Sequence, residues 1–168
     1  MNEILKIIIT LTLVTVIATT LLAMSYGITK PFIDKAKENN FQIQIKKIFP
    51  DSDSNRKVDS KFEVYSQNRL LGYAVLAYAN GYSSQIELLI GVSTDSKVAG
   101  VAVLSQSETP GLGTRITEQV FLQQFVGKSI NELTLSKYGG KIDGITGASV
   151  SSKAVVDTVK VTVEELHD

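Results

Sequence analysis

An uncharged apolar run from Ile7 to Thr29, ended by Lys30 and Pro31, constrains this chain more than any other feature. As an α-helix rising about 1.5 Å per residue, the run is about 35 Å long, enough to cross a hydrocarbon core about 30 Å thick. We therefore predict a membrane-spanning anchor over residues 1–30. Its threonine hydroxyls can bond to carbonyls one turn earlier or to a neighbouring helix of a partner subunit, and both interpretations stay open. These residues are Thr10, Thr12, Thr15, Thr19 and Thr20.

A cleavable signal peptide is the alternative interpretation, because the segment Ala23-Met24-Ser25 has small residues at the spacing that signal peptidase prefers. However, the run is longer than the usual apolar core of about 7–15 residues, and its amino-terminal flank offers only Lys6, offset by Glu3. The sequence therefore favours an anchor. Lysines after the run weakly favour a cytoplasmic carboxyl-terminal flank, but long domains are often translocated regardless of such charges. They are Lys30, Lys35 and Lys37.

Composition excludes several kinds of chemistry. The 168 residues include 17 basic and 17 acidic side chains, so no basic excess indicates nucleic-acid binding. The absence of cysteine excludes thiol catalysis, disulfides, cysteine-bound zinc and iron–sulfur clusters. The only histidine, His167, is the penultimate residue, where a precise metal ligand or catalytic base is not expected. Any chemistry must therefore come from a bound organic cofactor or from oxygen-based groups. We predict no metal site and name no catalytic side chain.

The rest of the chain has the pattern of one α+β domain. Residues 31–57 are expected to form an amphipathic helix over 31–48, bent near Asn39-Asn40, followed by a linker in the polar stretch Asp51–Ser60. Residues 58–168 form the domain, in which short polar turns between β-type runs predict an antiparallel sheet flanked by helices. The expected strands are Lys61–Ser66, Leu70–Ala79, Gln85–Ser93 and Val98–Ser105. The expected helices are Arg115–Phe125 and Ser151–Leu166.

The segment Glu108-Thr109-Pro110-Gly111-Leu112-Gly113 predicts a rigid loop of bare backbone between the last strand and a helix. Pro110 sets the backbone angle of the second position of a turn, and Gly111 supplies the positive φ that a type II turn needs next. Such a surface can lie against a flat ring, with Leu112 adding apolar contact. An ordinary strand-to-helix connector remains the alternative.

The segment Asp143-Gly144-Ile145-Thr146-Gly147-Ala148-Ser149 precedes the last helix. Backbone N–H groups at a helix start, together with the helix dipole, form an anion site that suits a phosphate. The segment is neither a P-loop nor a G-x-G-x-x-G motif. As an alternative, Ser149 or Ser151 is an ordinary helix N-cap.

Together, in this order, the two segments resemble the FMN-binding domain of the Rnf complex G subunit and of its relative, the Nqr complex C subunit. The family pattern Asp-x-x-Ser/Thr-Gly-Ala-Ser/Thr is matched by Asp143, Thr146, Gly147, Ala148 and Ser149, and the family loop Glu-Thr-Pro-Gly-Leu-Gly is present at 108–113. The resemblance covers about residues 58–160, and the short chain is more similar to the Rnf subunit.

The resemblance implies that FMN is attached to Ser149 through a phosphoester bond made by a flavin transferase, with Asp143 serving recognition by that enzyme. Thr146, Gly147 and Ala148 would surround the phosphate, and the isoalloxazine ring would rest on the 108–113 loop. The expected cofactor-binding residues of that loop are Glu108, Thr109, Pro110, Gly111, Leu112 and Gly113. Glu108 is expected to bond the flavin or to cap the next helix. Tyr78 or Tyr82 would support the ring or pack within the sheet.

The resemblance also implies a function: a membrane-anchored electron-transfer subunit of an Rnf-type complex that couples electron flow between ferredoxin and NAD⁺ to ion movement. Its expected partners are integral-membrane and iron–sulfur subunits, and it would not be catalytic alone. The FMN domain is expected on the extracytoplasmic side of a single-pass anchor. A stand-alone extracytoplasmic flavin reductase and a non-redox tethered binding module are the alternatives.

Overall fold

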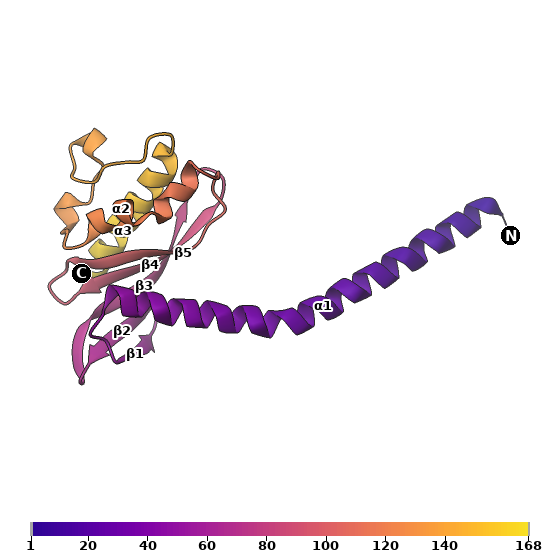
Figure 1. The fold of residues 1–168 in the computed structure, drawn as a ribbon, viewed down its shortest axis with the longest axis horizontal. Coiled ribbons are helices and arrows are strands. Elements are labelled where there is room, and N and C mark those ends of the chain that lie inside the picture. Colours follow the sequence, from indigo (N-terminus) through magenta and orange to yellow (C-terminus); the bar gives the residue numbers. More distant parts are fainter. Residues whose placement is uncertain (1, 168) are drawn as a thin grey trace. The chain divides into compact units, whose positions relative to one another are not determined.

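The computed structural model describes residues 2–167, which divide into two compact units between Asn40 and Phe41. Helix α1, Glu3–Ile48, begins in the first unit and ends in the second (Figure 1). Its apolar part is long enough and hydrophobic enough to cross a membrane, with a mean hydropathy of 2.4 and no buried residue in that window. Pro31 lies inside the helix, where it has no N–H to donate to the carbonyl of Gly27. The helix is also unbroken at Asn39 and Asn40.

Three of the five threonines named above bond to their own helix. The hydroxyls of Thr15, Thr19 and Thr20 donate to carbonyl oxygens three or four residues earlier, at 2.7–3.1 Å. These hydroxyl donors are therefore satisfied in the apolar part of α1 without a neighbouring helix.

The second unit is built on the predicted antiparallel meander, which has one more strand than expected. Strand order follows the sequence, and every neighbouring pair is antiparallel (Figure 1). The strands are β1 Ser54–Val58, β2 Lys61–Ser66, β3 Arg69–Asn80, β4 Gln85–Ser93 and β5 Val98–Ser105. The expectation of a loop throughout Asp51–Ser60 was wrong, because this stretch contains β1. Its polarity belongs to an exposed edge strand, on which Arg56 forms an ion pair with Glu63 of β2 at 2.7 Å.

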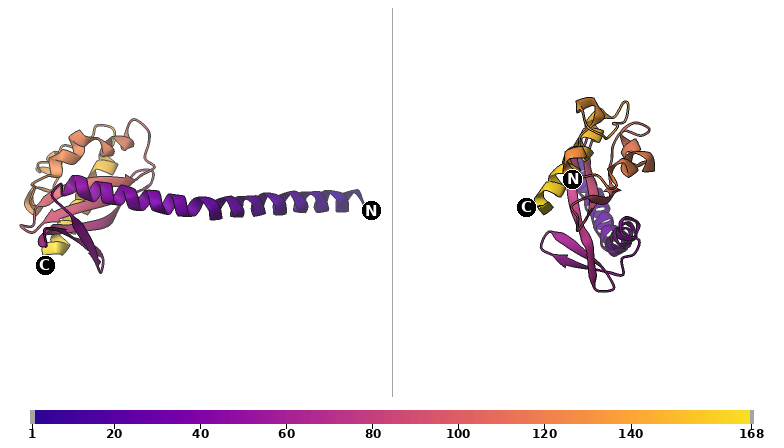
Figure 2. Two further views of the ribbon diagram at one scale, coloured as in Figure 1. Left: turned by 60° about the horizontal axis from the view of Figure 1, so that its bottom comes forward. Right: turned by 90° about the vertical axis from the view of Figure 1, so that its left-hand side faces the viewer.

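Helix α3, Ser149–His167, and a series of short helices cover one face of the sheet (Figures 1 and 2). The short helices are η1 Gly113–Thr117, α2 Gln119–Leu122, η2 Gln123–Phe125, η3 Ile130–Glu132 and η4 Ser136–Tyr138. This layer and the sheet enclose the larger core, whose biggest fully buried side chains are Phe125, Ile86, Leu88, Ile90, Ile116, Leu133 and Ile142. The core fixes α3 against β3 and β4, and the start of α3 is the candidate site.

The single helix expected at Arg115–Phe125 is wrong in detail. The chain forms η1, then an extended Glu118, then α2 and η2. The apolar side chains still point into one core, because Ile116, Phe121 and Phe125 are all buried. Helix α3 begins two residues before the expected Ser151, so that Ser149 is its first residue.

The last turns of α1 cover the opposite face of the sheet. Phe41, Ile45 and Phe49 are buried there in a second, smaller core that includes Leu89 and Ala102. Glycines in the sheet allow this close approach. A Cβ on Gly91 would lie 2.3 Å from Cγ2 of Ile48 and 3.0 Å from Cε2 of Phe49. The amphipathic part of α1 thus has its buried positions at its carboxyl-terminal end.

This packing predicts that Gly91→Ala destabilises the full chain by about 1–3 kcal/mol, because the added methyl group overlaps Ile48. Urea unfolding in detergent micelles measures this change. The loss in free energy of unfolding should be smaller when Gly91→Ala is made in an Ile48→Ala background, since the Cγ2 methyl group of Ile48 is then absent. An equal cost in both backgrounds would contradict the proposed contact.

Candidate functional site

The two glycine-containing segments lie together at the start of α3, where they line one cavity of about 430 Å³. Tyr82, from the turn between β3 and β4, lines the same cavity. The 108–113 loop contributes Glu108, Thr109, Leu112 and Gly113, and the second segment with the first turn of α3 contributes Gly147, Ala148, Ser149, Val150 and Ser151. Segments far apart in the sequence are thus brought together, in agreement with one shared site.

The 108–113 loop has the predicted turn at its centre. Gly111 has φ of +75°, and the N–H of Leu112 donates to the carbonyl of Thr109 at 3.2 Å. The hydroxyl of Thr114 accepts from the N–H of Gly111 at 2.9 Å and closes the loop onto η1. Pro110 and Gly111 are exposed and do not line the cavity, whereas Leu112 does.

Glu108 joins three parts of the site. Its side chain is only 4% exposed, yet the carboxylate has a partner on each oxygen. Oε1 accepts the N–H groups of Ser83 and Ser84, both at 2.9 Å, and Oε2 accepts the N–H of Tyr82 at 3.2 Å. The Ser151 hydroxyl of α3 donates to Oε2 at 2.6 Å. Glu108 therefore neither caps η1 nor offers an unpaired oxygen, and instead ties the β3–β4 turn to α3.

These hydrogen bonds keep Glu108 charged. Burial alone would raise the pKa of its carboxyl, but the donors from Ser151, Ser83, Ser84 and Tyr82 stabilise the ionised form and hold that pKa below its ordinary value. A buried carboxylate with several charge-assisted hydrogen bonds is a strong local constraint, because each donor loses its only partner if the carboxylate is removed.

Glycines make room for this arrangement. A Cβ on Gly81 would lie 2.4 Å from Oε1 of Glu108, and a Cβ on Gly113 would lie 2.7 Å from its Cβ. Gly147 has φ of +84°, and a Cβ there would meet Cδ2 of Leu112 at 3.0 Å. The glycines on both sides of the cavity are therefore required by close packing between the segments that line it.

Three serines lie in the first turn of α3, and their hydroxyls differ in availability. Ser151 and Ser152 are buried: Ser151 donates to Glu108, while Ser152 donates to the carbonyl of Ala148 at 2.9 Å and accepts the N–H of Ile145 at 3.0 Å. Ser149 is exposed and its hydroxyl has no hydrogen-bond partner within residues 2–167. The interpretation of Ser149 or Ser151 as an N-cap is wrong, because Ser149 is already helical and Ser151 bonds to a side chain.

The first turn of α3 also presents backbone donors. Among residues 2–167, no acceptor takes the N–H groups of Ser149, Val150 and Ser151, whereas the N–H of Ser152 donates to Ala148. Such N–H groups and the positive end of the helix dipole favour an anion at this end. No cluster of three metal-binding side chains occurs in the same described range, so the donor set suits a phosphate rather than a metal.

Asp143 and Thr146 are exposed and lie outside the cavity lining. The backbone of Asp143 is held by the side chain of Gln124, which accepts its N–H at 2.7 Å and donates to its carbonyl at 3.2 Å. The carboxylate itself forms no hydrogen bond or ion pair within the described chain. The structure thus presents Asp143 outward beside the site and not into it.

Of the two tyrosines that could support the ring, one lines the cavity. Tyr82 is 75% exposed and lines the cavity, whereas Tyr78 is exposed on β3 and does not. The sequence did not predict that Ser151 and Val150 line the cavity, or that backbone N–H groups of the β3–β4 turn bind Glu108. One signal was present: Ser151, Val155 and Val159 share one helical stripe, so Ser151 is on the buried face and needs a polar partner.

Similarity to known proteins agrees with this geometry. The profile of the FMN-binding domain family matches residues 81–164, which hold both segments. The G subunit of the ion-translocating oxidoreductase complex of Methanosarcina acetivorans is 35% identical over 97% of this chain and 94% of its own. The G subunit of the proton-translocating ferredoxin:NAD(+) oxidoreductase complex of Clostridium ljungdahlii is 35% identical over 98% of this chain and 92% of its own.

Solved structures resemble the fold. The C subunit of the Na(+)-translocating NADH-quinone reductase of Parabacteroides distasonis superposes with a TM-score of 0.52 and 25% identity, covering 61% of this chain and 58% of its own. NqrC of Shewanella oneidensis gives a TM-score of 0.53 at 23% identity, covering 68% of this chain and 64% of its own, which supports the fold alone.

The charged state of Glu108 predicts a pH-dependent contribution to stability. Its pKa in the folded chain is below the ordinary value of 4.5, so its contribution is complete above that pH and is lost as pH falls through the folded value. Glu108→Gln should destabilise the chain at neutral pH, and the difference in free energy of unfolding from wild type should narrow in acid. Urea titrations at several pH values measure this difference. A constant difference across the acid range would contradict an ionised Glu108.

Proposed function

Because the chain belongs to the FMN-binding domain family, we propose that it is the G-type electron-transfer subunit of an Rnf-type ion-translocating oxidoreductase complex, with FMN covalently held on Ser149. The observation that carries this proposal is the single available hydroxyl in the first turn of α3, beside unpaired backbone N–H groups and at the rim of a cavity.

The choice of Ser149 among its neighbours is supported by hydrogen bonding. The hydroxyls of Ser151 and Ser152 would have to break buried hydrogen bonds before they could react, whereas the Ser149 hydroxyl forms none within the described chain. In the proposed attachment, the hydroxyl loses its proton and a bond forms between Oγ and phosphorus. The bond from phosphorus to the leaving group of an activated flavin nucleotide breaks at the same time, so the step consumes no reductant or oxidant.

The surroundings of Ser149 fit a phosphoester. The N–H groups of Ser149, Val150 and Ser151 can donate to phosphate oxygens, and the dipole of α3 favours the negative charge by about 0.3–1 kcal/mol. Gly147 leaves this side of the backbone bare. The ionised Glu108 points its oxygens at protein donors and so does not oppose the phosphate with unpaired lone pairs.

The cavity supports the position proposed for the ring. Leu112 and Val150 supply apolar surface, and the exposed Tyr82 offers an aromatic face on the same cavity. Thr109 and Gly113 complete the wall from the 108–113 loop. When bound, FMN supplies the redox chemistry, and the protein contributes attachment, position and access. No side chain of the described chain is needed as an acid, base or metal ligand for electron transfer.

The apolar part of α1 is proposed as the single-pass membrane anchor, in line with relatives named as subunits of ion-translocating complexes. We place the flavin domain on the extracytoplasmic side, where a covalent bond prevents loss of the cofactor to a space with little free FMN. The proposed partners are the membrane and iron–sulfur subunits of the complex, and a flavin transferase during maturation.

A stand-alone anchored flavin reductase and a non-redox binding module explain less. Neither accounts for similarity to complex subunits over nearly the whole length of the chain, including the anchor. Purification of the native protein without membrane partners would favour the reductase, and a colourless native protein would favour the binding module.

Ser149→Ala should abolish covalent flavin, because the remaining serines of that turn keep their buried hydrogen bonds. In-gel flavin fluorescence under denaturing conditions, after co-expression with the transferase, measures attachment. Ser136→Ala, an exposed serine outside the cavity, is the matched control and should stay fluorescent. Fluorescence retained by the Ser149 variant would refute this acceptor.

Asp143→Asn should slow flavin loading while leaving the fold intact, because it removes an exposed charge but keeps the backbone bonds to Gln124. The time course of in-gel fluorescence with purified transferase measures loading, and thermal unfolding checks the fold. Loading at the wild-type rate would remove Asp143 from transferase recognition.

A further inference from the structure

The outer edge of β5 lies outside the proposed flavin site and ends the sheet without a further strand. In residues 2–167, β5 pairs with β4 alone in the sheet. Its segment from Ala99 to Leu104 contains no charged residue and no proline. Natural proteins normally protect such an edge with charges, proline, bulges or a covering segment, because unpaired backbone groups on an apolar edge recruit other strands. The pairing of β5 with β4 is irregular near both ends of this segment, but Gly100–Val103 between them is regularly paired.

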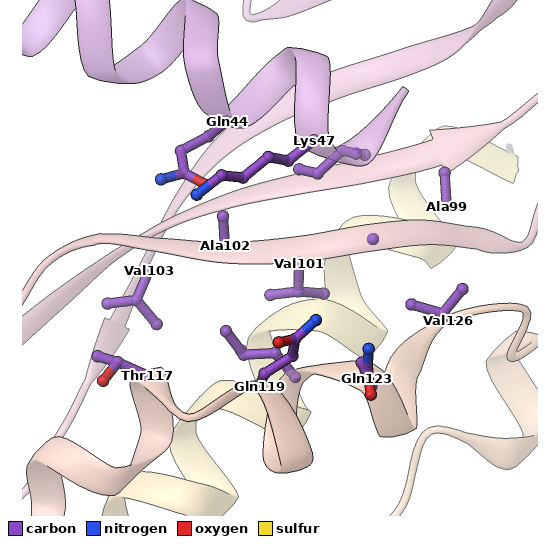
Figure 3. A pocket seen from close by; sticks show the side chains of 13 residues that line it. Gln44, Lys47, Ala99, Val101, Ala102, Val103, Thr117, Gln119, Gln123 and Val126 are labelled. Carbon is purple, nitrogen blue, oxygen red and sulfur yellow. The ribbon is translucent and has the colours of Figure 1, made fainter. Parts of the chain in front are cut away.

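This edge forms the floor of a groove of about 630 Å³ (Figure 3). The last turns of α1, with Gln44 and Lys47, form one wall, and the segment from Thr117 to Val126 forms the other. Residues Ala99–Val103 of β5 line the floor, a length of about 17 Å. That length matches one ordinary strand of five residues.

Side chains on the floor leave its backbone accessible. Figure 3 shows Ala99 and Ala102 directed toward the α1 wall, and Val101 and Val103 directed toward the opposite wall. Gly100, between them, has no side chain. The two walls thus stand on the two faces of the sheet, and the edge of β5 lies between them.

At one end of the groove, the chain's own backbone already pairs with the outer edge of β5. The N–H of Val98 donates to the carbonyl of Lys128 at 3.0 Å, and the N–H of Gly127 donates to the carbonyl of Val98 at 2.8 Å. After Lys128 the chain turns away into η3. The outer edge of β5 therefore accepts main-chain pairing at Val98 and offers the same chemistry along the groove.

We propose that this groove binds an extended segment of a partner polypeptide, which adds to the sheet beside β5 and carries an acidic residue next to Lys47. Main-chain hydrogen bonds along an edge strand are an established mode of peptide recognition. Lys47 is exposed, forms no ion pair within the described chain, and is the charged residue of the described groove lining. The other polar side chains of the walls are amides or a hydroxyl, so a carboxylate is the group complementary to Lys47.

We assign the groove to a single extended segment rather than to a second copy of this chain. Paired strands lie about 4.8 Å apart, so the edge of a second copy would have to approach that closely while carrying its own two helical walls. A single segment carries no such walls. The inference rests on the proposed function only for the source of the partner, a neighbouring subunit of the complex.

Hydrogen–deuterium exchange tests this proposal on the full-length chain, alone and in the native complex, in the same detergent. Amides of Ala99–Leu104 on the outer edge should exchange about tenfold or more slowly in the complex, since a new strand protects them. Gln123→Trp, which fills the groove, should remove this protection. Val120→Trp is the matched control, because Val120 is 79% exposed on the same helical segment and does not line the groove.

The same exchange measurement tests the role of the positive charge on Lys47. Lys47→Glu should weaken the protection, whereas Lys137→Glu, an exposed lysine away from the groove, should not. Equal exchange with and without the complex would overturn the proposal, as would equal effects of the groove variants and their controls. Protection that rises with concentration of the isolated chain would assign the edge to a second copy and overturn it too. In-gel fluorescence at Ser149, measured on each sample, reports separately whether the flavin proposal holds.

Discussion

The hydrogen bonds of the buried Glu108 carboxylate hold the candidate site together. It belongs to the 108–113 loop and hydrogen-bonds to both the β3–β4 turn and the first turn of α3. Its charge is tolerated in the interior because each oxygen has donors, and those donors are positioned because the charge is there. Gly81 and Gly113 follow from the same constraint, since a side chain at either position would overlap Glu108. Glu108 thus links the segments that line the cavity beside Ser149.

This arrangement explains how a chain with so little chemical equipment can serve redox chemistry. The chain has no cysteine, and its one histidine is next to the terminus. No cluster of three metal-binding side chains occurs among residues 2–167. We propose that the chain supplies attachment, because α3 leaves the Ser149 hydroxyl available while Ser151 and Ser152 are engaged. The larger core behind α3 keeps that turn in place against the sheet. We also propose that the sheet binds a partner, because the edge of β5 lies between the two walls of the groove and can pair with a further strand.

The sequence predicted the anchor, the four longer strands and both loops of the site, because each has a strong local signal: hydropathy, alternation, or glycine and proline in a turn. It failed where the deciding contacts are between distant segments. The polar residues of β1 have no local sign of a strand, and they pair with β2, on which Glu63 meets Arg56. The helix expected after the 108–113 loop breaks at Glu118, although its apolar spacing is helical. The partners of Glu108 lie 24 and more residues away, so no motif could have named them.

Intact mass of the chain purified from its native membrane tests the proposed covalent bond between FMN and Ser149. We expect the mass of the polypeptide plus one FMN less one water, with the added mass on the peptide that contains Ser149. A chain at the mass of its amino acids alone, or with the flavin mapped to another residue, would contradict it.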